Sequence, residues 1–166
     1  HKKMNTIKRK LNILKKRKID KKVENFFNWI KGAELVELKS CNITEDPVRP
    51  ELDVVFRRSY GRKIFGVKYK KEVCAIMCFG FTDEVPKTVK ELDLMTRDAY
   101  LKSAQRDQNI GKIAIAYTIW SKKRGGGKLI VKEVFKMIKK SNHLNRLITL
   151  SPLTEMARNF HLNNGA

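Results

Sequence analysis

The sequence has no long apolar stretch and only three cysteines. Its longest apolar run, residues 113–120, is interrupted only by Thr118 and is far shorter than the roughly 20 residues that a transmembrane helix needs. We therefore expect no transmembrane segment. Cys41, Cys74 and Cys78 are odd in number and lack metal-ligand spacing, which favours reduced thiols in a cytoplasmic protein. No cluster of His, Cys and acidic residues indicates a metal site.

Acidic residues are scarce beside basic ones. The 166 residues include 37 Lys and Arg against 17 Asp and Glu, a formal net charge of +20, yet 42% of the chain is hydrophobic. That hydrophobic share excludes a wholly disordered basic tail, and the length suffices for one domain with its own core. The basic N-terminus lacks the unbroken apolar stretch and small-residue cleavage site that are typical of a secretory signal.

About half of the net charge lies in the first 22 residues, which contain eleven Lys or Arg and one acid, Asp20. Apolar residues recur there and just beyond at spacings of three and four, as on one face of a helix: Ile7, Leu11, Leu14, Ile19, Val23, Phe26, Phe27 and Ile30. We predict a basic amphipathic helical arm over residues 1–31. Three roles stay open for it: packing on the domain, binding of nucleic acid or another polyanion through residues 2–22, and contact with an anionic membrane surface.

The rest of the chain mixes strand and helix signals. Short β-rich runs predict strands at residues 54–56, 63–69, 73–81, 113–120 and 147–150. The run at 113–120 is typical of a central strand covered on both faces. Apolar periodicity predicts helices at 128–140 and 154–163, the second with Thr154 as its N-cap, and residues 82–109 are predicted as a loop with weak helical character. We therefore predict a single domain over residues 50–166, after the helical arm.

Three consecutive glycines separate the central strand from the helix after it. Glycine lets the backbone approach a phosphate closely, and a helix N-terminus adds about half a positive charge. Basic residues surround the glycines, so the predicted phosphate-binding residues are Lys122, Lys123, Arg124, Gly125, Gly126, Gly127 and Lys128. Neither Gly-x-x-x-x-Gly-Lys-Ser/Thr nor Gly-x-Gly-x-x-Gly is present, which disfavours a nucleotide triphosphatase loop and a dinucleotide fingerprint. A flexible glycine turn is the alternative.

At this loop the sequence resembles the GNAT acyltransferase superfamily, whose pyrophosphate loop reads Arg/Gln-x-x-Gly-x-Gly/Ala. Residues 122–127, KKRGGG, fit it, with Lys122 in place of the usual Arg or Gln. Residues 157–166, ARNFHLNNGA, are similar to that superfamily's Ala-x-x-Phe-Tyr-x-x-x-Gly-Phe/Ala segment. The resemblance implies an α/β (α+β) fold with a mixed, mostly antiparallel central sheet flanked by helices. It also implies an N-acetyltransferase that uses acetyl-CoA or another acyl-CoA and an amine acceptor of unknown identity.

The sequence is more closely similar to the catalytic domain of malonyl-CoA decarboxylases. Leu150-Ser151-Pro152 and residues 159–166, NFHLNNGA, match two motifs that carry that family's catalytic Ser and His. The resemblance implies Ser151 and His161 as catalytic residues. His161 would protonate the departing thiolate in acyl transfer, or carbon in decarboxylation, and Ser151 would bind the malonyl carboxylate or the enolate. A turn residue for Ser151 and a half-buried helix residue for His161 are the structural alternatives.

The chain departs from both patterns. The decarboxylases carry a large N-terminal helical domain and a long insert between the Ser and His motifs, and this sequence has neither. The GNAT fold continues past the Gly-Ala pair with one or two strands, so we expect the domain to lack its last strands. An open sheet edge there would favour a homo-oligomer. A basic nucleic-acid-binding protein without catalysis is a further alternative.

Overall fold

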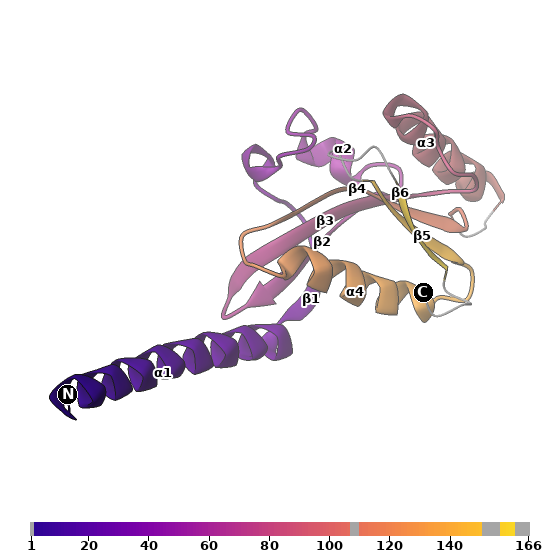
Figure 1. Ribbon diagram of the computed structural model, residues 1–166. Helices are drawn as coiled ribbons and strands as arrows, with labels where there is room; N and C mark the ends of the chain where they lie inside the picture. Colours follow the sequence, from indigo (N-terminus) through magenta and orange to yellow (C-terminus); the bar gives the residue numbers. More distant parts are fainter. Residues whose placement is uncertain (1, 107–109, 151–156, 162–166) are drawn as a thin grey trace. The chain divides into compact units, whose positions relative to one another are not determined.

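The computed structural model describes residues 2–106, 110–150 and 157–161 (Figure 1). The chain divides into two units, residues 1–33 and 34–166. The first unit holds one long helix, α1 (Lys2–Gly32), with twelve basic residues against two acidic ones, Asp20 and Glu24. No helix in these described ranges combines the length and apolarity that a bilayer span requires.

The second unit is built on a six-stranded sheet in the order β1-β2-β3-β4-β5-β6. The strands are β1 (Glu34–Leu38), β2 (Lys63–Tyr69), β3 (Glu72–Thr82), β4 (Ile113–Ser121), β5 (Arg146–Leu150) and β6 (Ala157–His161). Neighbouring strands run antiparallel, except that β4 and β5 are parallel. The predicted mixed, mostly antiparallel sheet is therefore confirmed, and β1 lies ahead of residue 50, where the sequence places the start of the domain.

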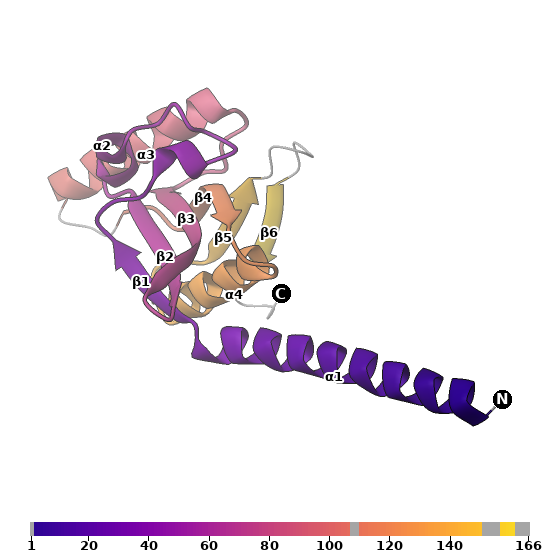
Figure 2. The same ribbon diagram turned by 90° about the vertical axis from the view of Figure 1, so that its left-hand side faces the viewer.

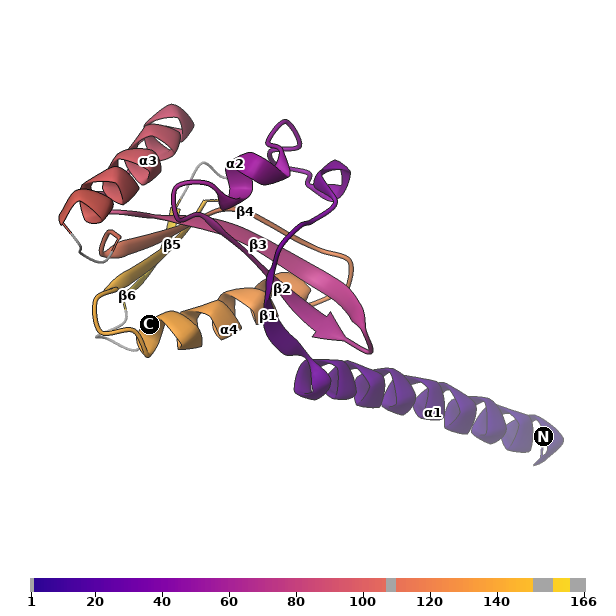
Figure 3. The ribbon, with the colours of Figure 1, turned by 180° about the vertical axis from the view of Figure 1, so that it is seen from behind.

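Helices cover both faces of this sheet. They are η1 (Ile43–Glu45), α2 (Val54–Arg58), α3 (Val89–Arg106) and α4 (Gly126–Lys139). Figures 1, 2 and 3 show α2 and α3 on one face and α4 on the other. The side chains at the centre are almost fully buried: Ile64, Met77, Phe79, Leu92, Ile115, Ile130, Val134, Ile138, Leu147 and Ile148. The central strand β4 is buried over most of its length, as its sequence predicts.

Two predicted elements are wrong. Residues 54–56 belong to helix α2 and not to a strand, because the Asp53 carboxylate accepts a hydrogen bond from Phe56 N at 2.7 Å and caps the helix. The helix predicted over residues 154–163 is contradicted at Ala157–His161, which forms β6 and pairs antiparallel with β5. Pairing satisfies the backbone groups on the edge of β5 that faces away from β4. Thr154, the predicted cap, lies outside the described residues.

The loop predicted over residues 82–109 is largely helix α3. Its start has a capping pattern that the apolar periodicity does not show: Glu91 N donates to Thr88 Oγ1 at 3.1 Å, and the Glu91 carboxylate accepts from Lys87 N at 2.7 Å. A Thr followed three residues later by Glu is the sequence signal that could have located this helix.

Candidate functional site

The glycine loop joins β4 to α4 in a tight turn. Gly125 has a φ of +82°, in the left-handed region that glycine adopts without strain. Gly126 N donates to Lys123 O and Leu129 N donates to Gly125 O, each at 3.0 Å. The helix therefore begins directly after Gly125, and its first turn faces the loop.

Ser121, at the end of β4, holds the loop in place. Its hydroxyl donates to Lys123 O at 2.6 Å and accepts from Lys123 N at 3.1 Å. A side chain at Gly126 would collide with Ser121 Oγ, whereas a methyl group at Gly127 would meet no atom within 4 Å. Gly126 is thus required by close packing, and Gly127 is not.

The first turn of α4 offers backbone donors to a ligand. Among the residues that the structure describes, no acceptor is found for Gly127 N or Lys128 N, as is usual for the first N–H groups of a helix. These groups and the helix dipole favour an anion at this position. Phosphate oxygens are suitable acceptors, so the loop fits the pyrophosphate group that its sequence predicts.

The basic side chains of the loop also contact the neighbouring strands and η1. Lys122 Nζ forms an ion pair with Glu45 at 3.1 Å, and Lys122 N donates to Cys74 O at 2.8 Å. Lys123 Nζ lies 4.9 Å from the centre of the Tyr69 ring. Glu45 therefore offsets part of the positive charge that the loop would present to an anion. It lies 77 residues before Lys122 in the chain, so no local sequence pattern points to it.

Replacing Glu45 with glutamine is expected to raise the affinity for inorganic pyrophosphate by roughly 1.4- to fivefold, because half-exposed ion pairs are worth about 0.2–1 kcal/mol. Calorimetric titration measures it. Glu37→Gln is the matched control, since Glu37 pairs at 3.0 Å with Lys63, outside the loop. Equal affinities for the two variants would contradict the role of Glu45.

The two parallel strands separate beside the loop. β5 pairs with β4 only at Ile113–Ala116, although β4 continues to Ser121. A register shift against β3 between Cys78 and Phe79 leaves Tyr117 unmatched in β4. In the described part of the chain, residues 117–121 thus have no partner in β5, and their backbone groups on that side can bind a ligand.

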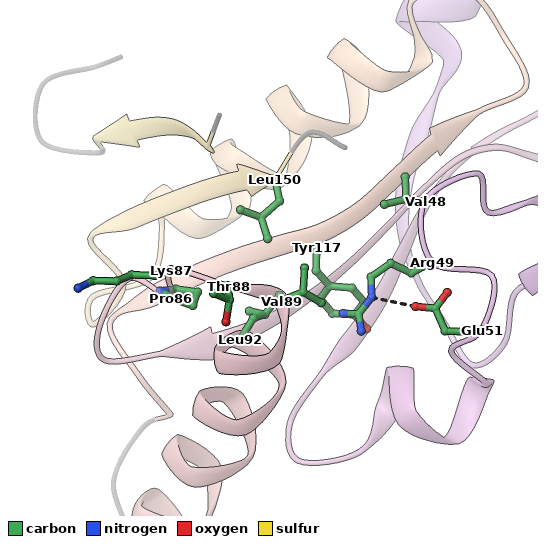
Figure 4. A pocket seen from close by; sticks show the side chains of 10 residues that line it. All are labelled: Val48, Arg49, Glu51, Pro86, Lys87, Thr88, Val89, Leu92, Tyr117 and Leu150. Atoms are coloured by element: carbon green, nitrogen blue, oxygen red, sulfur yellow. Dashed lines mark hydrogen bonds and ion pairs between the residues drawn. The ribbon is translucent and has the colours of Figure 1, made fainter. Parts of the chain in front are cut away.

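A pocket of about 620 Å³ lies at this separation (Figure 4). Tyr117 enters it from β4 and Leu150 from β5. Its lining is Val48, Arg49, Glu51, Pro86, Lys87, Thr88, Val89, Leu92, Tyr117 and Leu150. The walls are mainly apolar, with a few polar groups, as in most small-molecule sites.

Arg49 and Tyr117 provide the buried polar groups of this pocket. Arg49 makes a bidentate pair with Asp93, at 3.0 and 2.9 Å, and its Nε lies 3.4 Å from Glu51. Its guanidinium lies 5.7 Å from the centre of the Tyr117 ring. Tyr117 is 2% exposed, and within the described ranges its hydroxyl has no hydrogen-bond partner. Burial raises the pKa of Tyr117, so the phenol is neutral.

The seven predicted phosphate-binding residues are consecutive in the chain and form the turn between β4 and α4 and the start of α4. Ser151 lies outside the described residues. His161 ends β6, where its backbone pairs with Arg146. Arg146 starts β5 and Leu150 ends it, about 13 Å away along the strand. The catalytic roles of Ser151 and His161 stay predictions.

Comparison with known proteins gives structural matches only. No protein-family model matches the chain, and no curated protein sequence matches it. The crystal structure of malonyl-CoA decarboxylase from Cupriavidus metallidurans is similar at a TM-score of 0.53 and 22% identity, over 82% of this chain and 35% of that one. The chain has a GNAT-like fold, as predicted. It spans about a third of that decarboxylase.

Two further solved structures are similar, both with a TM-score of 0.49. One is malonyl-CoA decarboxylase from Rhodopseudomonas palustris, at 20% identity over 80% of this chain and 34% of that one. The other is the loading GNATL domain of CurA from Lyngbya majuscula, at 9% identity over 72% of this chain and 64% of that one.

Proposed function

We propose that this chain is an acyltransferase of the GNAT type that takes an acyl group from acetyl-CoA or another acyl-CoA and transfers it to an amine. The observation that carries the proposal is the glycine loop at the start of α4. Gly127 N and Lys128 N have no acceptor among the described residues and can donate to an anion, and the loop also carries Lys122, Lys123 and Arg124. The GNAT-like fold supports this reading, since the loop has the position that the superfamily's motif implies.

The separation of β4 from β5 leaves room and backbone hydrogen-bond donors for the thioester. With the pyrophosphate on the loop, the thioester arm can extend along the unpaired side of β4 at residues 117–121. A backbone N–H of β4 then donates to the thioester carbonyl, which stabilises the negative charge that develops on that oxygen. The pocket beside Tyr117 and Leu150 receives the acyl group and the amine.

The transfer also needs a proton for the departing thiolate. His161 is the predicted donor, because an imidazole titrates near neutral pH. β4 and β5 separate after Ala116, which pairs with Thr149 of β5. Thr149 in turn pairs with Arg158 of β6. The backbone of His161 lies three residues beyond Arg158, about 10 Å along β6 from the level at which the strands separate. If product forms equally fast with His161→Ala, this role is wrong.

Turnover tests the proposal. The full chain is incubated with acetyl-CoA and with malonyl-CoA, each with and without a primary amine, and the products are identified by mass. We expect free coenzyme A and the acylated amine to form only when the acyl-CoA and the primary amine are both present. If the protein forms neither acylated amine nor decarboxylated thioester, the proposal is wrong.

Decarboxylation of malonyl-CoA is the second candidate, favoured by the structural likeness to a malonyl-CoA decarboxylase. In this reaction Ser151 would hold the carboxylate or the enolate and His161 would protonate carbon. Acetyl-CoA formed from malonyl-CoA without any amine would support it over acyl transfer.

Binding of nucleic acid or another polyanion through residues 2–22 is a separate activity, favoured by the charge of α1. We expect DNA binding whose logarithmic affinity falls with log salt at a slope of about −4 or steeper, which corresponds to at least about four neutralised phosphates. Changing Lys15, Lys16, Arg17 and Lys18 to glutamine should flatten that slope in a filter-binding titration. The same change at Lys132, Lys136, Lys139 and Lys140 in and after α4 is the matched control. If the salt slope flattens equally in both variants, α1 has no specific role in DNA binding.

A further inference from the structure

Two cysteines and a buried cation meet in a cluster that acyl transfer does not use. Cys41 lies between β1 and η1 and is partly exposed, whereas Cys78 lies in the middle of β3 and is fully buried. Cys41 packs against the core cluster that contains Cys78, and each thiol is the largest influence on the pKa of the other. The Arg57 guanidinium, itself fully buried, has Nη1 3.6 Å from Cys78 Sγ and 2.8 Å from the Asp46 carboxylate.

The surroundings of the pair make the two thiols chemically different. The neighbouring thiol of Cys78 and the charge of Arg57 lower the pKa of Cys41 to about 7, against the opposing effect of burial. The neighbouring thiol of Cys41 and burial raise the pKa of Cys78. A large fraction of Cys41 is therefore thiolate at neutral pH, and thiolate is the reactive form. Burial raises the pKa of Cys74, the third cysteine.

We propose that Cys41 is an oxidant-reactive thiol and that Cys78 resolves it into an intramolecular disulfide. With a peroxide, the Cys41 thiolate attacks one oxygen, the O–O bond breaks, and the departing hydroxide takes a proton to become water. Cys41 is then a sulfenic acid. The Cys78 sulfur attacks the Cys41 sulfur, the S–O bond breaks, and the second water leaves with the Cys78 proton. In total, two thiols and one peroxide give one disulfide and two waters.

The pair is linked to the glycine loop by a short path. η1 starts two residues after Cys41, and its Glu45 pairs with Lys122 of the loop. Asp46, the next residue, binds Arg57 and accepts from Thr118 Oγ1 at 2.7 Å. A covalent bond from Cys41 to β3 draws the start of η1 closer to the sheet and changes the Glu45–Lys122 pair. This effect on the loop rests on the proposed function, whereas disulfide formation does not.

Peroxide oxidation of the full chain tests the pair directly. The protein is treated with hydrogen peroxide, the remaining thiols are alkylated under denaturing conditions, and the peptides are mapped by mass. The expected product is a cross-linked peptide pair containing Cys41 and Cys78, with Cys74 alkylated. The proposal would be overturned if Cys41 and Cys78 were both recovered as alkylated thiols after peroxide treatment. It would also be overturned if Cys74 were oxidised as fast as Cys41.

Single variants assign the two roles. Cys78→Ser should stop the reaction at a Cys41 sulfenic acid that dimedone traps, and Cys41→Ser should reduce dimedone labelling at least tenfold. Cys74→Ser is the matched control and should leave the rate unchanged. Alkylation of Cys41 in the native protein should accelerate with pH around a midpoint of about 7, set by Cys78 together with the charges of Arg57, Asp46 and Glu45. A midpoint equal to that of Cys74 would contradict the assignment.

A binding measurement separates this proposal from the proposed function. If the reduced protein binds pyrophosphate and the oxidised protein binds it with altered affinity, the path through Glu45 is supported. If the disulfide forms but pyrophosphate binds neither form, the thiol pair stands and the phosphate-loop assignment fails.

Discussion

Replacing Gly126 with valine is expected to lower the affinity for coenzyme A by at least about 30-fold. The new side chain would collide with Ser121 Oγ, which fixes the backbone of Lys123 through two hydrogen bonds. The loop then has to move, and the donors Gly127 N and Lys128 N no longer converge on the pyrophosphate. The loss of two charge-assisted hydrogen bonds, each worth about 1.5 kcal/mol or more, is enough to lower the affinity by about 30-fold or more. Calorimetric titration with coenzyme A measures the affinity.

Gly127→Ala is the matched control for this variant. A methyl group at Gly127 meets no atom within 4 Å, and alanine is a better helix former than glycine by about 0.8–1 kcal/mol. We expect coenzyme A to bind this variant as it binds the unmodified protein and the melting temperature to rise by a few degrees. If Gly126→Val binds as well as Gly127→Ala, close packing at Gly126 is not what shapes the site.

Replacing Arg57 with methionine is expected to lower the free energy of unfolding by about 3–5 kcal/mol, because it leaves the Asp46 carboxylate buried without its cation. Both side chains are 0% exposed and their ion pair measures 2.8 Å. Arg57 also donates to Leu52 O at 2.9 Å and Arg49 O at 2.8 Å, so three hydrogen bonds to oxygen atoms are lost together. Urea denaturation gives the free energy.

Arg58→Met controls for the loss of a positive charge in the same helix. Arg58 is exposed, so its replacement should change the free energy of unfolding by less than about 0.5 kcal/mol. The double variant Arg57→Met with Asp46→Asn should lose less free energy of unfolding than the sum of the losses in the two single variants. The reason is that the double variant leaves no unpaired charge buried. Strict additivity would contradict a coupled buried pair.

Acid unfolding provides an independent check of this pair. Burial acts to raise the pKa of Asp46, but hydrogen bonds from Thr118 and Arg57 outweigh it and lower the pKa from its ordinary value of 3.8. A carboxyl group with a lowered folded pKa stabilises the fold above its unfolded pKa of about 3.9, and this contribution is lost as the pH falls through the folded pKa. The stability difference between the unmodified protein and Asp46→Asn should shrink below pH ~4.

The sequence predicts the parts of the fold that local patterns control. An apolar run identifies β4, and three glycines followed by an amphipathic stripe identify the loop and α4, because hydrophobic periodicity and glycine conformation act within a few residues. α2 was missed because one capping bond from Asp53 outweighs the strand preference of Val54 and Val55. β6 was missed because pairing with β5, and not its own pattern, determines it.

The candidate site divides in the same way. The basic residues predicted to bind phosphate are adjacent in the chain, so a local pattern is enough to single them out. The pairs around the loop and the pocket join residues that are distant in the chain: Glu45 pairs with Lys122, Arg49 with Asp93, and Asp46 with Thr118. Only folding brings such pairs together, so neither composition nor spacing could reveal them.

Calorimetric titration with coenzyme A and with pantetheine, which has the thiol arm but neither pyrophosphate nor nucleotide, tests the central claim most directly. If the glycine loop binds the pyrophosphate, coenzyme A binds at least about tenfold more tightly than pantetheine, and this advantage shrinks as salt screens the loop charges. The absence of binding heat with coenzyme A at millimolar concentration, or equal affinity for the two compounds, would contradict it.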